Sequence, residues 1–256
     1  MSEKPLVYTV ENQVARFTIN REKQRNSLTG EVISLFMEYL ERAEADAEIR
    51  AVLVTGAGDK AFCSGADLGG AVAGEGQDPY QRYADLLKMI AGFSKPTVAR
   101  INGYCLAGGM GFMLGCDIVI ARDDARFGTP EVNVGLFPMM IGALIFRNVL
   151  RKKAMEMTLL GEMLTAKEAL KMGLITRCVP YEKLDASVDT VLETLCSKSP
   201  IGLRLGKEAF HAMADMPLEE ALDYLSGMLG KVVATEDAVE GITAFIEKRK
   251  PEFKGR

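Results

Sequence analysis

Residues 103–117, GYCLAGGMGFMLGCD, decide how the rest of this 256-residue chain is interpreted. The stretch has the apolar character of a buried helix, yet glycine stands at positions 108, 109, 111 and 115. Each glycine inside a helix costs roughly 1 kcal/mol relative to alanine, so four of them indicate a packing or a binding requirement. No acidic or basic side chain lies between residues 103 and 116. The helix can therefore bind through its backbone but supplies no proton-transfer group.

The segments around this stretch predict an α/β core. Residues 51–56 (AVLVTG), 95–103 (KPTVARING) and 117–121 (DIVIA) are apolar runs typical of strands covered on both faces. Residues 6–10 and 14–19 are β-rich runs separated by a three-residue turn, which predicts a hairpin. Apolar spacing predicts helices over residues 31–46 and 80–92. Alternating strands and helices favour parallel pairing in the sheet.

From about residue 139 the pattern becomes helical. We expect helices within residues 151–161, 165–173, 181–198, 201–215, 218–230 and 235–250. Thr165 and Thr235 are suited to cap two of them, and Glu168 completes a capping box with Thr165. The predicted division is an α/β core over residues 1–195 and a helical oligomerisation region over residues 196–256.

Composition narrows the class of protein. The chain is 48% hydrophobic and 26% charged with a net charge of −4, which excludes a disordered or fibrous chain and disfavours a broad nucleic-acid surface. The five cysteines form no C-x-x-C pair, as expected for reduced thiols in the cytoplasm. The longest apolar run, residues 135–146, is interrupted by Pro138, and the N-terminus lacks the apolar core of a signal peptide. We expect a cytoplasmic protein with no nucleic-acid or membrane partner.

His211 is the only histidine, so a zinc site or a Ser-His-Asp triad would have to use it. It lies in an alanine-rich helical stretch far from the glycine-rich turns, and we expect neither a metal site nor a catalytic histidine.

Two turns share the order strand, small residues, helix start: residues 63–67 and residues 106–109. Small residues let a ligand approach backbone N–H groups closely. The first N–H groups of a helix lack internal partners and carry the positive end of its dipole. Two such groups converging on one point form an oxyanion hole for a carbonyl oxygen that becomes an enolate. The alternative is that the glycines serve only tight helix packing. No phosphate-loop motif is present.

Four segments carry a resemblance to a known family: AFCSGADL (61–68), INGYCLAGGMGFMLGCD (101–117), ARFGTPEVNVGLFP (125–138) and GITAFIEKRKPEFKGR (241–256). In this order and spacing they resemble the crotonase superfamily, the enoyl-CoA hydratase/isomerase family. The resemblance implies a crotonase-like spiral β-β-α core with a C-terminal helical trimerisation region. It also implies a homo-oligomer, a trimer or a hexamer of two trimers. The implied substrate is an acyl-CoA thioester, with no cofactor beyond the coenzyme A of that substrate.

The resemblance also implies a site. The amides of Ala66 and Gly108 form the oxyanion hole, and Glu131 matches the second of the two glutamates of the hydratases. Gly111 stands where the first glutamate is found, and Met139 stands where the family often has glycine. The implied substrate-binding residues are Arg25, Asn26, Ala61, Cys63, Gly65, Asp67, Leu68, Tyr104, Met110, Gly111, Pro130, Met139, Phe245 and Lys248.

For three polar residues near the predicted site a structural role is the alternative. Asp67 would support its turn, Tyr104 would be a core residue, and Asp117 would be structural. A stripe of methionines at helical spacing is usually core, although Met110, Met113, Met139 and Met140 suggest an apolar pocket.

One carboxylate suits one class of reaction. A single shuttling glutamate can take a proton from one carbon and return it to another, which predicts enoyl-CoA isomerisation. Burial among apolar side chains should raise the pKa of Glu131 and strengthen it as a base. Hydration by Glu131 alone and a catalytically weak CoA-ester binder are the alternatives. RNA binding ranks last, because the basic clusters are short.

Basic residues at two places could hold the phosphates of coenzyme A. Arg21, Lys23 and Arg25 follow the predicted hairpin, and the resemblance implies that Phe245 and Lys248 reach the CoA of a neighbouring subunit. The alternative for both segments is a solvated face. Residues 69–80, GGAVAGEGQDPY, are predicted to form a surface loop near the site entrance.

Overall fold

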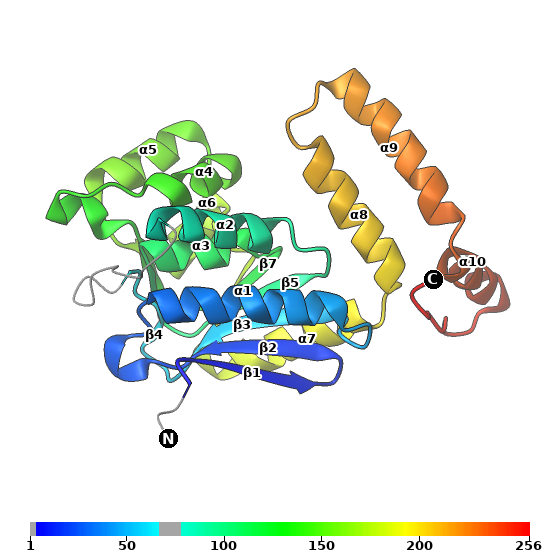
Figure 1. Ribbon diagram of the computed structural model, residues 1–256, viewed down its shortest axis with the longest axis horizontal. Coiled ribbons are helices and arrows are strands. Elements are labelled where there is room, and N and C mark those ends of the chain that lie inside the picture. Colours follow the sequence, from blue (N-terminus) through cyan, green and yellow to red (C-terminus); the bar gives the residue numbers. More distant parts are fainter. Residues whose placement is uncertain (1–3, 67–77) are drawn as a thin grey trace.

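The computed structural model describes residues 4–66 and 78–256. A six-stranded sheet of order β1-β2-β3-β5-β7-β10 forms its centre (Figure 1). Its strands are β1 (Leu6–Glu11), β2 (Val14–Ile19), β3 (Ala51–Gly56), β5 (Thr97–Ile101), β7 (Ile118–Arg122) and β10 (Arg177–Val179). β1 and β2 pair antiparallel, and all other neighbours pair parallel. The predicted hairpin, the three buried strands and their parallel pairing are confirmed.

A second sheet has the strand order β4-β6-β8-β9, and three of its strands run parallel to one another. Its members are β4 (Ala61–Cys63), β6 (Tyr104–Leu106), β8 (Arg126–Gly128) and β9 (Leu164–Thr165). β4 pairs parallel with β6 and β6 with β8, whereas β9 is antiparallel to β8. The chain passes from β5 into β6 through Gly103, where a Cβ would lie 2.9 Å from the backbone N of Ala61. The predicted strand over residues 95–103 ends near this close approach of two backbones, and the glycine-rich stretch follows it.

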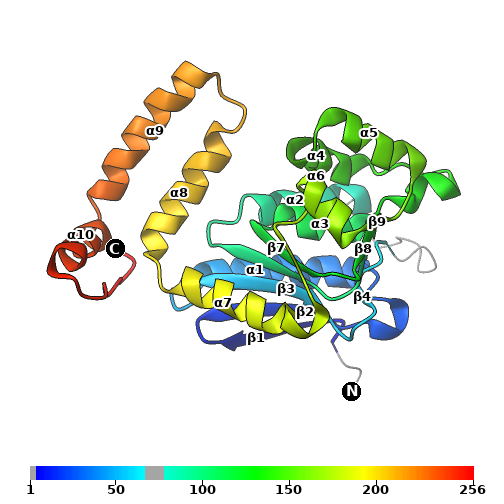
Figure 2. The ribbon, with the colours of Figure 1, turned by 180° about the vertical axis from the view of Figure 1, so that it is seen from behind.

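Helices cover both faces of the central sheet (Figures 1 and 2). They are α1 (Gly30–Ala45), α2 (Pro79–Ala91), α3 (Gly108–Gly115), α4 (Met139–Asn148), α5 (Arg151–Leu160), α6 (Ala166–Met172), α7 (Leu184–Cys196), α8 (Pro200–Met213), α9 (Leu218–Val233) and α10 (Glu236–Glu247). Short 3-10 turns form at Glu22–Gln24, Pro130–Val134 and Tyr181–Lys183. α1, α2 and α3 cover one face, and α7 covers the other. The fold is therefore three-layered.

Apolar packing on both faces explains these layers. On the α1 face, the rings of Phe17 in β2 and Phe36 in α1 meet edge to face, with centroids 5.2 Å apart. On the α7 face, Val188 packs with Leu53 and Val98 in a separate buried cluster. The predicted helix over 31–46 is confirmed, and Thr29 caps it by accepting a hydrogen bond from the Val32 N–H at 3.3 Å.

The region after residue 139 is not purely helical, which corrects the sequence-based expectation. β9 returns to the second sheet and β10 extends the central sheet next to β7. Strands of two or three residues are too short to show a periodic pattern. They form because strands far upstream offer free pairing edges. The predicted caps are confirmed: Thr165 and Glu168 form a capping box, and Thr235 accepts a hydrogen bond from the Ala238 N–H at 3.1 Å.

The last three helices project to one side of the sheet body (Figures 1 and 2). Lys207 of α8 ties this arm to the core through an ion pair with Asp117 and a 2.8 Å hydrogen bond to the carbonyl of Lys95. Asp117 also accepts hydrogen bonds from the N–H and hydroxyl of Thr97, at 2.7 and 2.9 Å. The structural role predicted for Asp117 is thereby confirmed. The division at residues 195 and 196 stays a prediction. No helix within the described ranges is long and apolar enough to cross a bilayer.

Candidate active site

Three parallel strands of the second sheet end at one edge and deliver the candidate catalytic residues there. Register pairs Cys63 with Cys105, and Leu106 with Gly128. The chain leaves β4 toward Ala66, β6 toward Gly108 and β8 toward Glu131. Because parallel strands share the direction of their carboxyl ends, all three residues lie at the same edge.

The turns that follow β4 and β6 touch each other. Gly65 has a φ of +92°, and a Cβ there would lie 2.6 Å from the Cβ of Ala107 and 3.2 Å from the backbone N of Gly108. Ala107 itself has a φ of +49°, a strained value for a residue with a Cβ. Its N–H donates to the carbonyl of Gly128 at 2.9 Å, which ties the turn to β8. Strained turns held by their surroundings are typical of functional sites.

Two backbone N–H groups are free at this contact. Within residues 4–66 and 78–256, neither the Ala66 N–H nor the Gly108 N–H has a hydrogen-bond acceptor. Gly108 begins α3, so its N–H lies at the positive end of the helix dipole. Paired donors of this kind can stabilise negative charge on an oxygen.

The other glycines of α3 serve helix packing. The packing interpretation therefore applies to these glycines, and the interpretation as a binding surface applies to Gly108. A Cβ at Gly109 would lie 2.5 Å from the carbonyl oxygen of Cys63, and one at Gly115 would lie 3.1 Å from the Cβ of Ile90. A Cβ at Gly108 would meet nothing closer than 3.4 Å. Close packing explains Gly109 and Gly115, whereas a Cβ at Gly108 would make only ordinary van der Waals contacts with Tyr83 and Leu28.

Glu131 is the carboxylate at this edge. It lies in the first turn of the 3-10 helix Pro130–Val134, and its carbonyl accepts a 3.0 Å hydrogen bond from the Leu136 N–H. Its side chain is half-buried, and Oε2 is buried with no hydrogen-bond partner among the described residues. Burial raises the pKa of Glu131. The direction of this shift agrees with the sequence-based expectation and favours proton uptake.

Residue 111 has no room for a side chain. A Cβ there would collide with the Tyr83 hydroxyl and would lie 2.8 Å from Leu87 Cδ2 and 2.9 Å from Ile141 Cγ2. The Tyr83 hydroxyl donates to the carbonyl of Gly108. Burial raises the pKa of Tyr83 well above its usual value, and the negative charge of Glu131 adds to this shift.

Sequence reasoning missed Tyr83. Its only sequence signal is membership of the buried face of α2, with Leu86, Leu87 and Ile90. That pattern marks a core residue and gives no sign that a hydroxyl reaches α3.

Several predicted substrate-binding residues are buried in the protein. The amide of Asn26 donates to the carbonyls of Ala61 and Ala57 at 2.7 and 3.0 Å, and its Oδ1 accepts from the Arg21 N–H at 3.0 Å. Asn26 thereby fastens the turn after β2 to the turn before β4. The side chains of Ala61, Cys63 and Met110 are also fully buried. Burial raises the pKa of the Cys63 thiol to about 12, so this thiol is unreactive.

Other predicted residues lie at the surface. Tyr104 is 47% exposed, so the expectation of a core tyrosine is wrong. β6 is a three-residue strand whose middle residue, Cys105, is buried in the core. Arg25 is exposed, and its carbonyl accepts the Ser64 N–H at 3.1 Å, which places it beside the turn that leads to Ala66.

The four methionines do not form one apolar pocket. Met139 is exposed at the start of α4, and Met140 packs against the core. Met110 and Met113 are core residues. Pro130 is half-buried beside Glu131. Asp67, Leu68 and residues 69–77 of the predicted loop lie outside the described residues.

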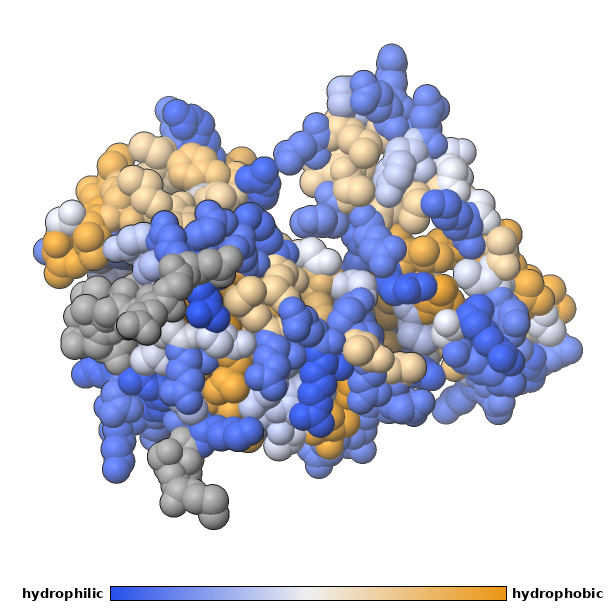
Figure 3. Space-filling view, viewed as in Figure 1, coloured by the Kyte–Doolittle hydropathy of each residue, from blue (hydrophilic) through white to orange (hydrophobic). Residues whose placement is uncertain are grey.

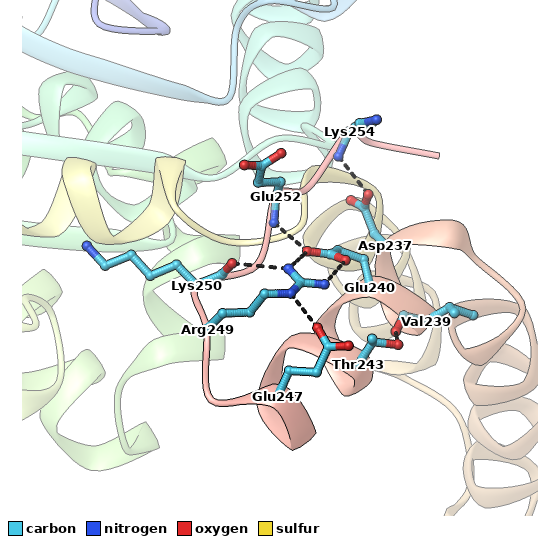
Figure 4. Close-up of polar contacts among 9 residues, drawn as sticks. All are labelled: Asp237, Val239, Glu240, Thr243, Glu247, Arg249, Lys250, Glu252 and Lys254. Carbon is cyan, nitrogen blue, oxygen red and sulfur yellow. Dashed lines mark hydrogen bonds and ion pairs between the residues drawn. The ribbon is translucent and has the colours of Figure 1, made fainter.

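The C-terminal residues predicted to reach a neighbouring subunit are exposed and held in place. Phe245 is 85% exposed, and Lys248 ends α10 in a left-handed conformation. Figure 4 shows how the following chain is fastened: Arg249 pairs with Glu240 at 2.6 Å and Glu247 at 2.7 Å. This cluster folds the tail back against α10.

A second set of contacts holds the last residues of the chain. Asp237 accepts a hydrogen bond from the Lys254 N–H at 2.7 Å (Figure 4). It accepts another from the Gly255 N–H at 3.1 Å. The hydroxyl of Ser199, at the start of α8, donates to the same carboxylate at 2.7 Å. Asp237 therefore joins the tail to two helices of the arm.

The arrangement at this edge is suited to proton transfer beside a stabilised oxygen. Two N–H groups without an acceptor among the described residues follow the ends of two parallel strands, and a carboxylate with a raised pKa follows the end of the third. In the described part of the chain no three His, Cys, Asp or Glu side chains gather as metal ligands. The expectation that no cofactor is needed beyond the coenzyme A of the substrate stays a prediction.

Comparison with known proteins agrees with this geometry. The model of the enoyl-CoA hydratase/isomerase family matches residues 9–256. The chain is 35% identical to (E)-benzylidenesuccinyl-CoA hydratase of Thauera aromatica, over 98% of this chain and 99% of that protein. It is 34% identical to a short-chain-enoyl-CoA hydratase of Clostridium acetobutylicum, over 96% of both chains.

A solved structure of an enoyl-CoA hydratase of Mycobacterium smegmatis superposes with a TM-score of 0.93 at 31% identity, covering 98% of this chain and 99% of that one. The fold and site thus define a crotonase-type enzyme. The chain belongs to the enoyl-CoA hydratase/isomerase family.

Proposed function

We propose that this enzyme shifts the double bond of a 3-enoyl-CoA to the 2-position, with Glu131 as its single acid/base. The observation that carries the proposal is the pairing of one unpartnered buried carboxylate oxygen on Glu131 with a residue 111 that has no room for a second carboxylate. A two-glutamate hydration site cannot be built from these positions.

The chemistry follows from three groups. The thioester oxygen accepts hydrogen bonds from the Ala66 and Gly108 N–H groups, which stabilises the charge that develops when a proton leaves C2. Glu131 takes that proton, and the electrons spread over a dienolate. Glu131 then returns the same proton to C4, which leaves the double bond between C2 and C3. No net proton is gained or lost, so one carboxylate suffices.

Exposed basic residues are available for the phosphates of coenzyme A. Lys23 and Arg25 are exposed next to the turn at Ser64. Arg21, by contrast, donates through its guanidinium to Ser27 at 2.8 Å, so it helps to hold the loop. We assign Lys23 and Arg25 to phosphate contacts, together with Lys248 and Phe245 from a neighbouring copy.

The C-terminal arm carries apolar side chains suited to self-association. Leu218, Leu222, Leu229, Val233, Val239, Ile242, Phe245 and Ile246 are all more than half exposed. Figure 3 shows apolar side chains on the arm and again over the α4–α5 region. Exposed apolar area of this kind is typical of a contact surface. We infer a homo-oligomer, a trimer or a hexamer, and a cytoplasmic location stays a prediction. Sedimentation velocity would contradict the inference by showing a 28 kDa monomer at micromolar concentration.

Hydration is the second candidate, because the relatives named above are called hydratases. In that reaction Glu131 would activate water without a carboxylate from residue 111. A binder of CoA esters without catalysis is disfavoured, because such a binder needs neither a raised pKa on Glu131 nor paired free N–H groups beside it.

The deciding experiment is turnover of 3-enoyl-CoA and 2-enoyl-CoA, followed by ultraviolet absorbance and product chromatography. Glu131→Gln should lower isomerisation by about 10²–10⁴-fold, the usual contribution of a positioned general base. Retained activity in Glu131→Gln would refute the role of Glu131. Hydration without isomerisation by the wild type would establish the second candidate instead.

A further inference from the structure

Tyr83 of α2 and Gly111 of α3 fit each other in size. The Tyr83 hydroxyl stands where the first carbon of a residue-111 side chain would have to lie. We propose that Tyr83 determines the reaction specificity of this site: it takes up the space of a second carboxylate and so restricts the enzyme to one-base chemistry. The inference rests on the proposed function for its substrate and on the packing alone for its geometry.

The phenol cannot swing out of this position. Tyr83 is buried in the main apolar core, and its ring lies 6.2 Å from that of Phe112, which in turn packs 4.8 Å from Phe36. At the other end, the hydroxyl donates to the carbonyl of Gly108. A side chain held at both ends excludes any residue that would share its volume.

The chemistry of the hydroxyl differs from that of the carboxylate it replaces. A phenol in a buried site beside Glu131 stays protonated at neutral pH. Its one proton is already donated to the Gly108 carbonyl. Tyr83 therefore cannot take a proton from water as a carboxylate does, and proton uptake is left to Glu131.

The hydroxyl of Tyr83 also lies close to the proposed oxyanion hole, which links this residue to the reaction specificity of the site. A Cβ at Gly108 would lie 3.4 Å from the Tyr83 hydroxyl, so the phenol stands beside the residue whose N–H donates a hydrogen bond to the substrate oxygen in the proposed function. Any group that took the place of Tyr83 would lie beside Gly108. The choice between a phenol and a carboxylate at this point therefore bears directly on the reaction.

A thermal-unfolding cycle tests the geometry without any substrate. Gly111→Ala should lower the melting temperature by up to roughly 4–8 °C, because overpacking costs about 1–3 kcal/mol and alanine regains only about 1 kcal/mol over glycine in a helix. In the Tyr83→Phe background the same substitution should lower it by less than half as much, because Leu87 and Ile141 present only side-chain methyl groups that can shift. Equal losses in the two backgrounds would overturn the proposed fit.

A second experiment tests specificity. Gly111→Glu alone should fold poorly, because Tyr83 occupies the space. Tyr83→Ala together with Gly111→Glu should raise the ratio of hydration to isomerisation at least tenfold over both the wild type and Tyr83→Ala. An unchanged ratio in a folded, active double variant would overturn the role of Tyr83. A wild type that turns over neither substrate would instead overturn the proposed function, and the unfolding cycle would still decide the fit of the two residues.

Discussion

Gly109→Ala should weaken the oxyanion hole by pushing its two halves apart. The added Cβ would lie 2.5 Å from the carbonyl oxygen of Cys63, whereas ordinary contacts of a Cβ begin near 3.4 Å, so the two backbones must separate by about 0.9 Å. Cys63 lies three residues before Ala66, and Gly109 directly follows Gly108. The separation therefore moves the two N–H donors relative to each other.

The magnitude follows from this displacement. A misplacement of about 1 Å can cost on the order of 10²-fold in rate, so kcat/KM for the enoyl-CoA should fall roughly 10- to 100-fold. Overpacking should cost about 1–3 kcal/mol of unfolding free energy, partly offset by the roughly 1 kcal/mol that alanine gains over glycine in a helix. The net loss should be about 0–2 kcal/mol. The assays are enoyl-CoA turnover and urea unfolding.

Gly142→Ala is the matched control. It places the same methyl group in helix α4, where a Cβ at residue 142 would meet no atom within 4 Å. It should stabilise the protein by about 0.5–1 kcal/mol. If Gly109→Ala were as active as the wild type and as stabilised as Gly142→Ala, the close contact between α3 and Cys63 and the reasoning built on it would be refuted.

Three further outcomes follow from the burial of individual groups. Burial raises the folded pKa of Glu131 above its unfolded value, so the protonated carboxyl favours folding at low pH and this contribution is lost as the pH rises through the folded pKa. Glu131→Gln should therefore gain stability relative to the wild type as the pH rises above about 4.3, the usual pKa of a glutamate, and parallel urea-unfolding profiles would contradict this. Asp237→Ala removes the acceptor of three hydrogen bonds in a buried site and should cost about 2–4 kcal/mol, with Asp237→Asn losing less; equal losses would argue against the clamp. Because the pKa of Cys63 is about 12, only about one thiol in 10⁴ is ionised at pH 8, and iodoacetamide mapping by mass spectrometry should find Cys196 alkylated well before Cys63.

Patterns within one segment predicted the elements of the fold. Apolar runs identified the strands β3, β5 and β7, and helical spacing of apolar residues identified α1. These signals suffice because a strand or helix buries its own apolar face. β9 and β10 were missed because their only cause is an upstream strand edge, at β8 and β7. The exposure of Tyr104 was missed because β6 is too short for alternation to be decisive.

The same distinction between patterns within one segment and contacts between distant segments applies to the candidate site. Its proposed backbone donors at Ala66 and Gly108 and its proposed carboxylate at Glu131 were predicted from the family resemblance that short motifs carry, since each motif contains its own strand end and turn. Asn26 shows the limit of that approach, because its motif position suggested substrate binding, while its amide is engaged by carbonyls more than thirty residues away.

The sequence by itself determined the order of most strands and helices, the two small-residue turns, the glutamate at residue 131 and the absence of a side chain at residue 111. Only the tertiary structure decided what fills the space at residue 111. Tyr83 and Gly111 stand on different helices, and their contact depends on how α2 packs across α3. Apolar periodicity in α2 marks Tyr83 as buried, but it cannot specify the atom that its hydroxyl meets. That choice is made by the close packing of two helices, and here it determines the space in which the chemistry takes place.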